Sequence, residues 1–124
     1  MTYDPDQQPD AAWWLELDES ERIEQVHSAL SARGEEPPPV RATVQAVVET
    51  QIAAYEPPAV RRAAERLTDE GLRRNIVLRT LTVKLIQHMH RAMQQGGFDH
   101  AAYERDLDSL TGAAILAGAL GLKD

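Results

Sequence analysis

Four histidines are the first side chains in this sequence that could bind a metal ion or move a proton: His27, His88, His90 and His100. On a helix, His88 and His90 would point about 200° apart, so they cannot share one ion as an i, i+4 pair can. We expect one of them to lie near the edge of the core and the other in solvent. His100 belongs to the first turn of a predicted helix and is expected to be exposed. No metal site and no cofactor are predicted.

Glu49 is the carboxylate that could act in acid–base catalysis. It stands beside Gln51 on the flank of a valine-rich helix face, where burial could raise its pKa into the range of a general base. More often such a carboxylate reaches solvent or pairs with an arginine. The sequence has no G-x-S-x-G motif, no glycine-rich phosphate loop and no cysteine nucleophile, so we favour a protein that is not an enzyme.

Basic residues concentrate between Arg61 and Arg91. Eight basic and three acidic side chains give this segment a charge of +5, while five basic and seventeen acidic side chains give the rest −12. One interpretation is an anion-binding patch, with these candidates: Arg61, Arg62, Arg73 and Arg74. The interpretation that we favour is pairing with the acidic residues between Glu16 and Glu24. No aromatic residue is interleaved with the arginines, so a base-stacking platform is not indicated.

Two adjacent tryptophans, Trp13 and Trp14, form the candidate interface. Neighbours on a short helix point in different directions. We expect one ring to dock into the core and the other to stay partly exposed. The favoured interpretation is that both fix the first helix to the body of the protein, and the alternative is an aromatic anchor for a partner.

The length and composition indicate what has to position these residues. A chain of 124 residues with 43% hydrophobic content and no cysteine is expected to form one domain around a modest core, without disulfides. We assign residues 1–9 to a flexible polar tail and residues 10–124 to a single helical domain. The acidic N-terminus does not resemble a secretory signal, and no apolar run could cross a membrane, so a cytoplasmic protein is expected.

The apolar spacing is helical throughout, and the predicted class is all-α. Capping residues and prolines predict helices that begin near these positions: Asp10, Asp18, Pro39, Pro58, Arg73 and Asp99. An Ala/Gly-rich segment after Thr111 is a possible last helix. Short connections favour five to seven short helices stacked as antiparallel hairpins. Either an irregular bundle or an armadillo/HEAT-like right-handed superhelix would satisfy this pattern.

Three segments carry a family resemblance that covers residues 13–103. They read W-L-E-L-D-E-S-E-R-I-E-Q-V from Trp14, V-V-E-T-Q-I-A from Val47 and P-x-V-R-R-A-A-E-R-L-T-D-E-G-L from Pro58. In order and spacing they resemble an uncharacterised family of small bacterial all-helical proteins, known as a domain of unknown function. The resemblance implies an all-helical fold and supplies no established activity.

The same resemblance implies a divergent polar site. Members carry a histidine in the third helix and an H-x-x-x-H-like pair after E-G-L, a set that could hold a metal. The corresponding residues here are Gln45, Asn75 and Arg79, which would not replace imidazoles as ligands. Glu49 and Gln51 match the polar pair of the third helix. The candidate polar cluster is therefore Gln45, Glu49, Gln51, Asn75 and Arg79, expected to form hydrogen bonds without a metal.

Three functions remain open from the sequence. The favoured one is a non-enzymatic helical module that binds a protein partner or self-associates. The second is a divergent member of a metal-binding helical family, with hydrolysis as the reaction that such a metal could support, that has lost its ligands. The third is a weak binder of anions or nucleic acid through the arginine-rich segment, although the acidic balance of the chain disfavours a nucleic-acid partner. No membrane partner is expected.

Overall fold

A computed structural model describes residues 1–121, with side chains for residues 1–118, and the described part contains seven α-helices and no strand. The helices are α1 (Ala11–Glu16), α2 (Glu19–Ala32), α3 (Pro39–Ala54), α4 (Pro58–Asp69), α5 (Arg74–Gln95), α6 (His100–Asp108) and α7 (Gly112–Gly121). The prediction of an all-α fold is confirmed. The segment after Thr111 forms a helix through Gly121, and the last three positions lie outside the described residues.

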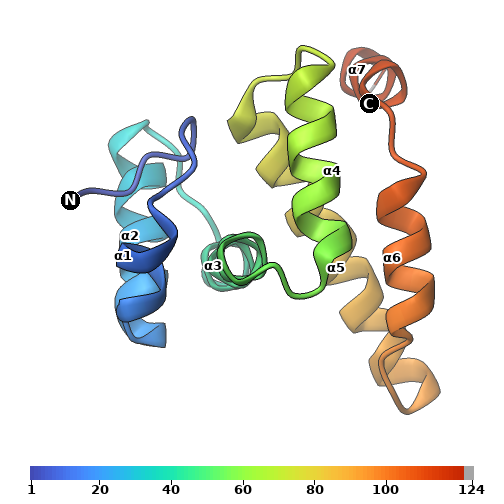
Figure 1. The fold of residues 1–124 in the computed structure, drawn as a ribbon, viewed down its shortest axis with the longest axis horizontal. Coiled ribbons are helices and arrows are strands. Elements are labelled where there is room, and N and C mark those ends of the chain that lie inside the picture. The colour runs from blue at the N-terminus through green and yellow to red at the C-terminus, as the bar shows by residue number, and fades with distance from the viewer. Residues whose placement is uncertain (122–124) are drawn as a thin grey trace.

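Helix α3 occupies the centre of the fold. Figure 1 views it almost end-on, with α1 and α2 on one side and α4, α5 and α6 on the other. It packs against α1, α2, α4 and α5. Since α2 and α4 lie in the plane of that view, α3 crosses both of its neighbours in the chain. The architecture is therefore an irregular bundle, in which α3 departs from a simple stack of antiparallel hairpins.

The helix ends follow the local signals in the sequence. The Asp10 side chain accepts a hydrogen bond from the backbone of Trp13 at the start of α1, and Asp99 does the same for α6. Pro58 is the first residue of α4, where its missing N–H has no partner to lose. Gly96 ends α5 with a φ of 82°, a conformation that favours glycine. The predicted caps and breaks are thus confirmed.

Replacing Asp18 by alanine is expected to destabilise the protein by about 1 kcal/mol, because Asp18 caps α2. Its carboxylate accepts from the Glu21 backbone at 2.8 Å, and the Glu21 side chain accepts from the Asp18 backbone at 2.8 Å. Urea denaturation of D18A measures the loss. Ser20→Ala in the exposed first turn is the control and should stay close to the wild type; equal losses in both variants would show that the capping box contributes nothing.

Two hydrophobic clusters meet at α3. The smaller one joins the N-terminal segment, α1, α2 and α3, and consists of Tyr3, Trp14, Val26, Leu30, Ala42 and Ala46. The larger one joins α3, α4, α5 and α6 and includes Val48, Leu67, Leu78, Leu81 and Tyr103. Because α3 supplies side chains to both clusters, most of its circumference is buried. The polar and apolar sites described below both include side chains of α3.

The two tryptophans differ in burial as expected. Trp14 is fully buried, and its indole N–H donates to Thr50 Oγ1 at 3.1 Å. Trp13 is half-buried and lies edge-on to Trp14, with ring centroids 6.0 Å apart. The prediction of one docked and one partly exposed ring is confirmed. Trp14 is a core residue and leaves only Trp13 as a candidate interface ring.

Residues 1–9 differ from the flexible tail that the sequence suggests. Tyr3 is only 3% exposed and belongs to the smaller cluster. Its backbone N–H donates to Gln25 Oε1 at 3.0 Å, and Arg33 pairs with both Asp4 and Asp6. The N-terminal segment is packed onto the helical domain because a single aromatic side chain reaches a buried polar partner.

Candidate functional site

The buried polar cluster is built around Glu49, whose side chain is completely inaccessible to solvent. Arg74, the first residue of α5, holds it with two hydrogen bonds of 2.8 Å, one to each carboxylate oxygen. The Tyr3 hydroxyl donates to Oε2 of the same carboxylate at 2.5 Å. Gln45, one helical turn before Glu49 on α3, donates to the Tyr3 oxygen at 3.2 Å. Three segments far apart in the chain therefore converge on one charge.

The electrostatics of this cluster favour a fixed ion pair. Burial lowers the pKa of Arg74, but the hydrogen bonds and charge of Glu49 outweigh it and raise that pKa above its usual value. Burial and the adjacent Glu49 carboxylate raise the pKa of Tyr3 well above its usual value of 10.0. The arginine stays charged and the tyrosine stays protonated. Both carboxylate oxygens of Glu49 accept hydrogen bonds, and the side chain is inaccessible to solvent, so it does not face a substrate cavity.

The other predicted members of the polar cluster are dispersed. Gln51 lies on a different side of α3 and accepts from the Tyr103 hydroxyl at 3.1 Å. Arg79 is exposed and lines a hollow between α5 and α7. Asn75 is half-buried, and its Oδ1, like Oε1 of Gln45, lies buried without a hydrogen-bond partner among the described residues. Of the five candidates, the structure thus brings only Gln45 and Glu49 into the cluster.

Two functional members of the cluster were not expected from the sequence. Tyr3 lies 46 positions from Glu49 in a segment assigned to a tail, and nothing in the local sequence indicates its burial. Arg74 was a candidate for anion binding, but its guanidinium is committed to Glu49 and donates to the Pro5 and Gln7 carbonyls. The general expectation that a carboxylate near a core pairs with an arginine was the only available signal.

Most of the other arginine candidates also have partners. Arg61 pairs with Glu65 and lies over the Tyr55 ring at 4.0 Å. Arg62 pairs with Asp108 at 3.0 Å, while Arg73 is exposed at the start of α5. The expectation of pairing with residues 16–24 is corrected: the partners lie on α3, α4 and α6. Helices α3, α4 and α6 pack together with α5, whereas residues 16–24 belong to the end of α1 and to α2, which lie on the other side of α3 (Figure 1).

The histidines are distributed as the spacing predicts. His88 is buried and its Nε2 lies 2.9 Å from Asp106 Oδ2, whereas His90, His27 and His100 are exposed. The pKa of Asp106 is lowered from its usual value. Partial burial would raise it, but the hydrogen bond with His88 and the charge of Lys84 outweigh that effect. Among the described residues, no group of three or more acidic or histidine side chains is placed to hold a metal ion.

Added zinc is expected to leave the melting temperature unchanged, because a ligand stabilises a fold only by binding its native state. The positions that the family resemblance assigns to histidines carry Gln45, Asn75 and Arg79. Thermal unfolding with and without excess zinc checks this. A rise of several degrees that a chelator reverses would contradict it.

The stability of the protein is expected to fall as the pH rises above 10. Burial raises the pKa of Tyr103, although its hydrogen bond to Gln51 opposes this rise. The pKa of Tyr3 is raised as well. The unfolded state releases these protons near pH 10 while the folded state keeps them, so unfolding becomes easier. Urea denaturation at about pH 9 and about pH 11 measures the slope. Tyr3→Phe should reduce that slope, and an unchanged slope would contradict the assignment.

An apolar groove on α3 contrasts with this buried ion pair, because it is open to solvent and most of its lining residues are uncharged, with two carboxylates among them. It has a volume of about 720 Å³ between α3, the start of α4, the end of α5 and α6. We call it the α3–α6 groove; it is lined by Thr43, Val44, Val47, Gln51, Glu56, Pro57, Pro58, Leu85, Met89, Phe98, His100, Tyr103 and Glu104. Val47 and Met89 are 39% and 42% exposed there.

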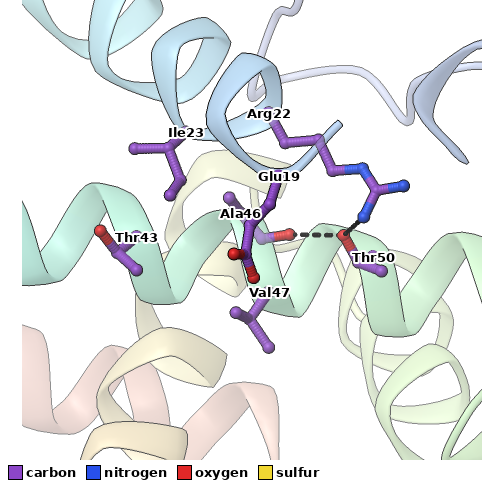
Figure 2. A pocket seen from close by; sticks show the side chains of 7 residues that line it. All are labelled: Glu19, Arg22, Ile23, Thr43, Ala46, Val47 and Thr50. Atoms are coloured by element: carbon purple, nitrogen blue, oxygen red, sulfur yellow. Dashed lines mark hydrogen bonds between the residues drawn. The ribbon is translucent and has the colours of Figure 1, made fainter. Parts of the chain in front are cut away.

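A smaller hollow of about 210 Å³ adjoins this groove across α3. Figure 2 shows Glu19, Arg22 and Ile23 of α2 facing the α3 residues. Arg22 is held in place by the carbonyls of Trp14 and Leu15, at 3.0 and 2.9 Å. Thr43 and Val47 line both hollows. The exposed face of α3 therefore separates the two hollows, and the hollows form one continuous surface because they share these two residues.

Comparisons with protein-family models, with curated proteins and with solved structures give no match for this chain. The resemblance described above therefore stays a prediction from the sequence. None of the helices that the structure describes combines the length and the apolar character needed to span a bilayer.

Proposed function

We propose that this chain is a non-enzymatic helical protein-interaction module of the bacterial cytoplasm, and that it binds its partner through the α3–α6 groove. The observation that supports this most strongly is the pair of hollows that share Thr43 and Val47. Contiguous exposed apolar surface at a depression is typical of an interaction site.

The exposed apolar residues support a binding role for this face. Val47 on α3 and Met89 on α5 line the groove and are 39% and 42% exposed. Methionine side chains are flexible and polarizable, which suits a surface that adapts to a partner. The polar residues at the margin, such as Glu56 and Glu104, are typical of the rim of an interface.

The two buried groups that could perform chemistry, Glu49 and His88, support a non-enzymatic role, because each has a structural partner. Glu49 is fully buried and accepts hydrogen bonds from Arg74 and Tyr3. The Nε2 atom of His88 is engaged by Asp106, beneath the aromatic rings of Phe98 and Tyr103. A general base needs a free lone pair within reach of a substrate. The alternatives of a lost metal site and of an anion-binding patch stay predictions from the sequence.

Site-specific photo-crosslinking in the source bacterium tests this function. A benzophenone amino acid replaces Thr43, which is exposed and lines both hollows. The matched control carries the same probe at Arg91, which is exposed on α5 and lines no hollow described here. Mass spectrometry identifies the crosslinked species, and Met89→Glu is added in each background to block the groove.

The proposal expects one defined protein, captured at Thr43 and lost with Met89→Glu, and no such product at Arg91. A partner captured equally at both positions, or unaffected by Met89→Glu, would place the binding surface elsewhere. Absence of any protein product at Thr43 would contradict the interaction role of this face.

A further inference from the structure

We propose that the occupant of the α3–α6 groove is an amphipathic α-helix of a partner protein whose apolar stripe is flanked by lysine or arginine. This inference rests on the proposed function and adds the chemistry of the partner. Three properties of the groove lead to it: its apolar floor, its length and the sign of its charge.

The floor of the groove suits apolar side chains inserted from above. Val44, Leu85 and Tyr103 are buried at its base, while Val47, Met89 and Phe98 remain at least partly accessible at its sides. Phe98 and His100 both line the groove, and their rings pack edge-to-face with centroids 4.9 Å apart. Such a surface is typical of a site that takes an apolar stripe of a helix.

The length of the groove matches two turns of a helix. Its α3 lining runs from Thr43 to Gln51, and eight steps of 1.5 Å make about 12 Å. Anchors at positions i, i+4 and i+7 of a bound helix span about 10.5 Å. A partner helix that lies along α3 could therefore insert three apolar side chains into the groove, between the Val47 side chain of α3 and the Met89 side chain of α5.

The charge of the groove selects a cationic partner. Glu56 and Glu104 line it, and no lysine or arginine is among the described lining residues of the groove itself; Glu19 lines the adjoining hollow together with Arg22. None of these three carboxylates forms an ion pair with another residue in the described part of the chain. The net charge of −7 adds a long-range field of the same sign. Basic residues beside the apolar stripe would therefore meet complementary charge.

The test uses two synthetic peptides of about five helical turns. Both carry leucines at helical spacing; one has lysines on the flanks and the other has glutamates at the same positions. Fluorescence anisotropy measures their binding to the full chain. We compare Val47→Glu, the double variant Glu56→Gln/Glu104→Gln, and the matched control Glu24→Gln/Glu36→Gln, which removes the same charge from exposed sites outside the groove. Circular dichroism confirms that each variant is folded.

The inference expects the lysine peptide to bind at least about tenfold more tightly than the glutamate peptide. Val47→Glu should abolish binding, and Glu56→Gln/Glu104→Gln should weaken it clearly more than the control pair. Equal losses in the two double variants would indicate non-specific attraction and overturn the inference.

Other outcomes separate this inference from the proposed function. If both peptides bind equally and Val47→Glu abolishes both, the groove is a helix site without charge selection, and only the inference fails. If neither peptide binds while crosslinking at Thr43 succeeds, the partner is of another kind. Light scattering that shows a dimer disrupted by Val47→Glu would identify a second copy as the occupant and overturn the inference.

Discussion

Arg74→Ala is expected to destabilise the protein by about 3–5 kcal/mol, because it leaves the Glu49 carboxylate buried without its counter-ion. The Glu49 side chain has no exposed surface and that of Arg74 is only 10% exposed, with both hydrogen bonds at 2.8 Å. Solvent cannot replace the guanidinium unless the packing around α3 opens. Urea denaturation at neutral pH measures this loss.

A double replacement separates the effect of an orphaned charge from the net contribution of the pair. Glu49→Leu/Arg74→Met removes both charges and keeps similar volumes, so it should recover much of the stability lost in Arg74→Ala. Arg62→Ala is the surface control, since Arg62 and Asp108 are 54% and 46% exposed, and such pairs contribute about 0–1 kcal/mol. A loss in Arg74→Ala no larger than in Arg62→Ala would show that the buried pair is not structural.

Trp14→Ala is expected to cost about 3–5 kcal/mol, the usual effect of truncating a large core aromatic side chain. Trp14 is fully buried beside Tyr3, with ring centroids 5.3 Å apart. Its removal leaves a cavity and the Thr50 hydroxyl without the indole donor. Denaturation curves followed by circular dichroism avoid reliance on the lost fluorescence.

Trp13→Ala is the matched control for this prediction, because it removes the same side chain from the neighbouring half-buried position. It should cost clearly less than Trp14→Ala. Trp14→Phe should lie between the two, since it keeps a ring and loses the hydrogen bond to Thr50. Similar losses for both alanine variants would contradict the division of roles between the two rings.

Helix ends were predictable because their causes are local. Asp18 caps α2 through a residue three positions away, and Gly96 ends α5 through its own backbone conformation. The burial of one tryptophan was also predictable, since one ring of an adjacent pair on a short helix has to face inward; that it is Trp14 was not predicted. Signals of this range are contained in a few consecutive residues.

The exposed face of α3 could not be predicted from apolar spacing. Helical spacing predicts that the valine-rich face beside Glu49 consists of Val40, Val44, Val47, Val48 and Ile52, but Val40 and Val47 are exposed while the other three are buried. This part of the prediction was wrong because apolar residues nearly surround the helix. Which of them meets a neighbour depends on how α2 and α5 cross α3.

The ion pairs could not be predicted from the sequence either, because they also depend on how the helices pack. Glu49 and Arg74 are 25 positions apart, and Arg62 and Asp108 are 46 apart. Composition indicated an imbalance of charge between segments but not the partner of any arginine. Tyr3 is the clearest example of a contact that the sequence does not predict. Its neighbours in the chain are polar, yet its side chain completes the buried cluster around Glu49.

The most direct test of the central claim combines the crosslinking probe at Thr43 with two folded variants. One is Glu49→Leu/Arg74→Met, which removes the buried ion pair, and the other is Val47→Glu, which changes only the exposed face of α3. If α3 binds a partner through its outer face and holds the fold through its inner one, the ion-pair variant keeps the crosslinked product and Val47→Glu loses it. Loss of the product in the ion-pair variant, with full retention in Val47→Glu, would contradict the account.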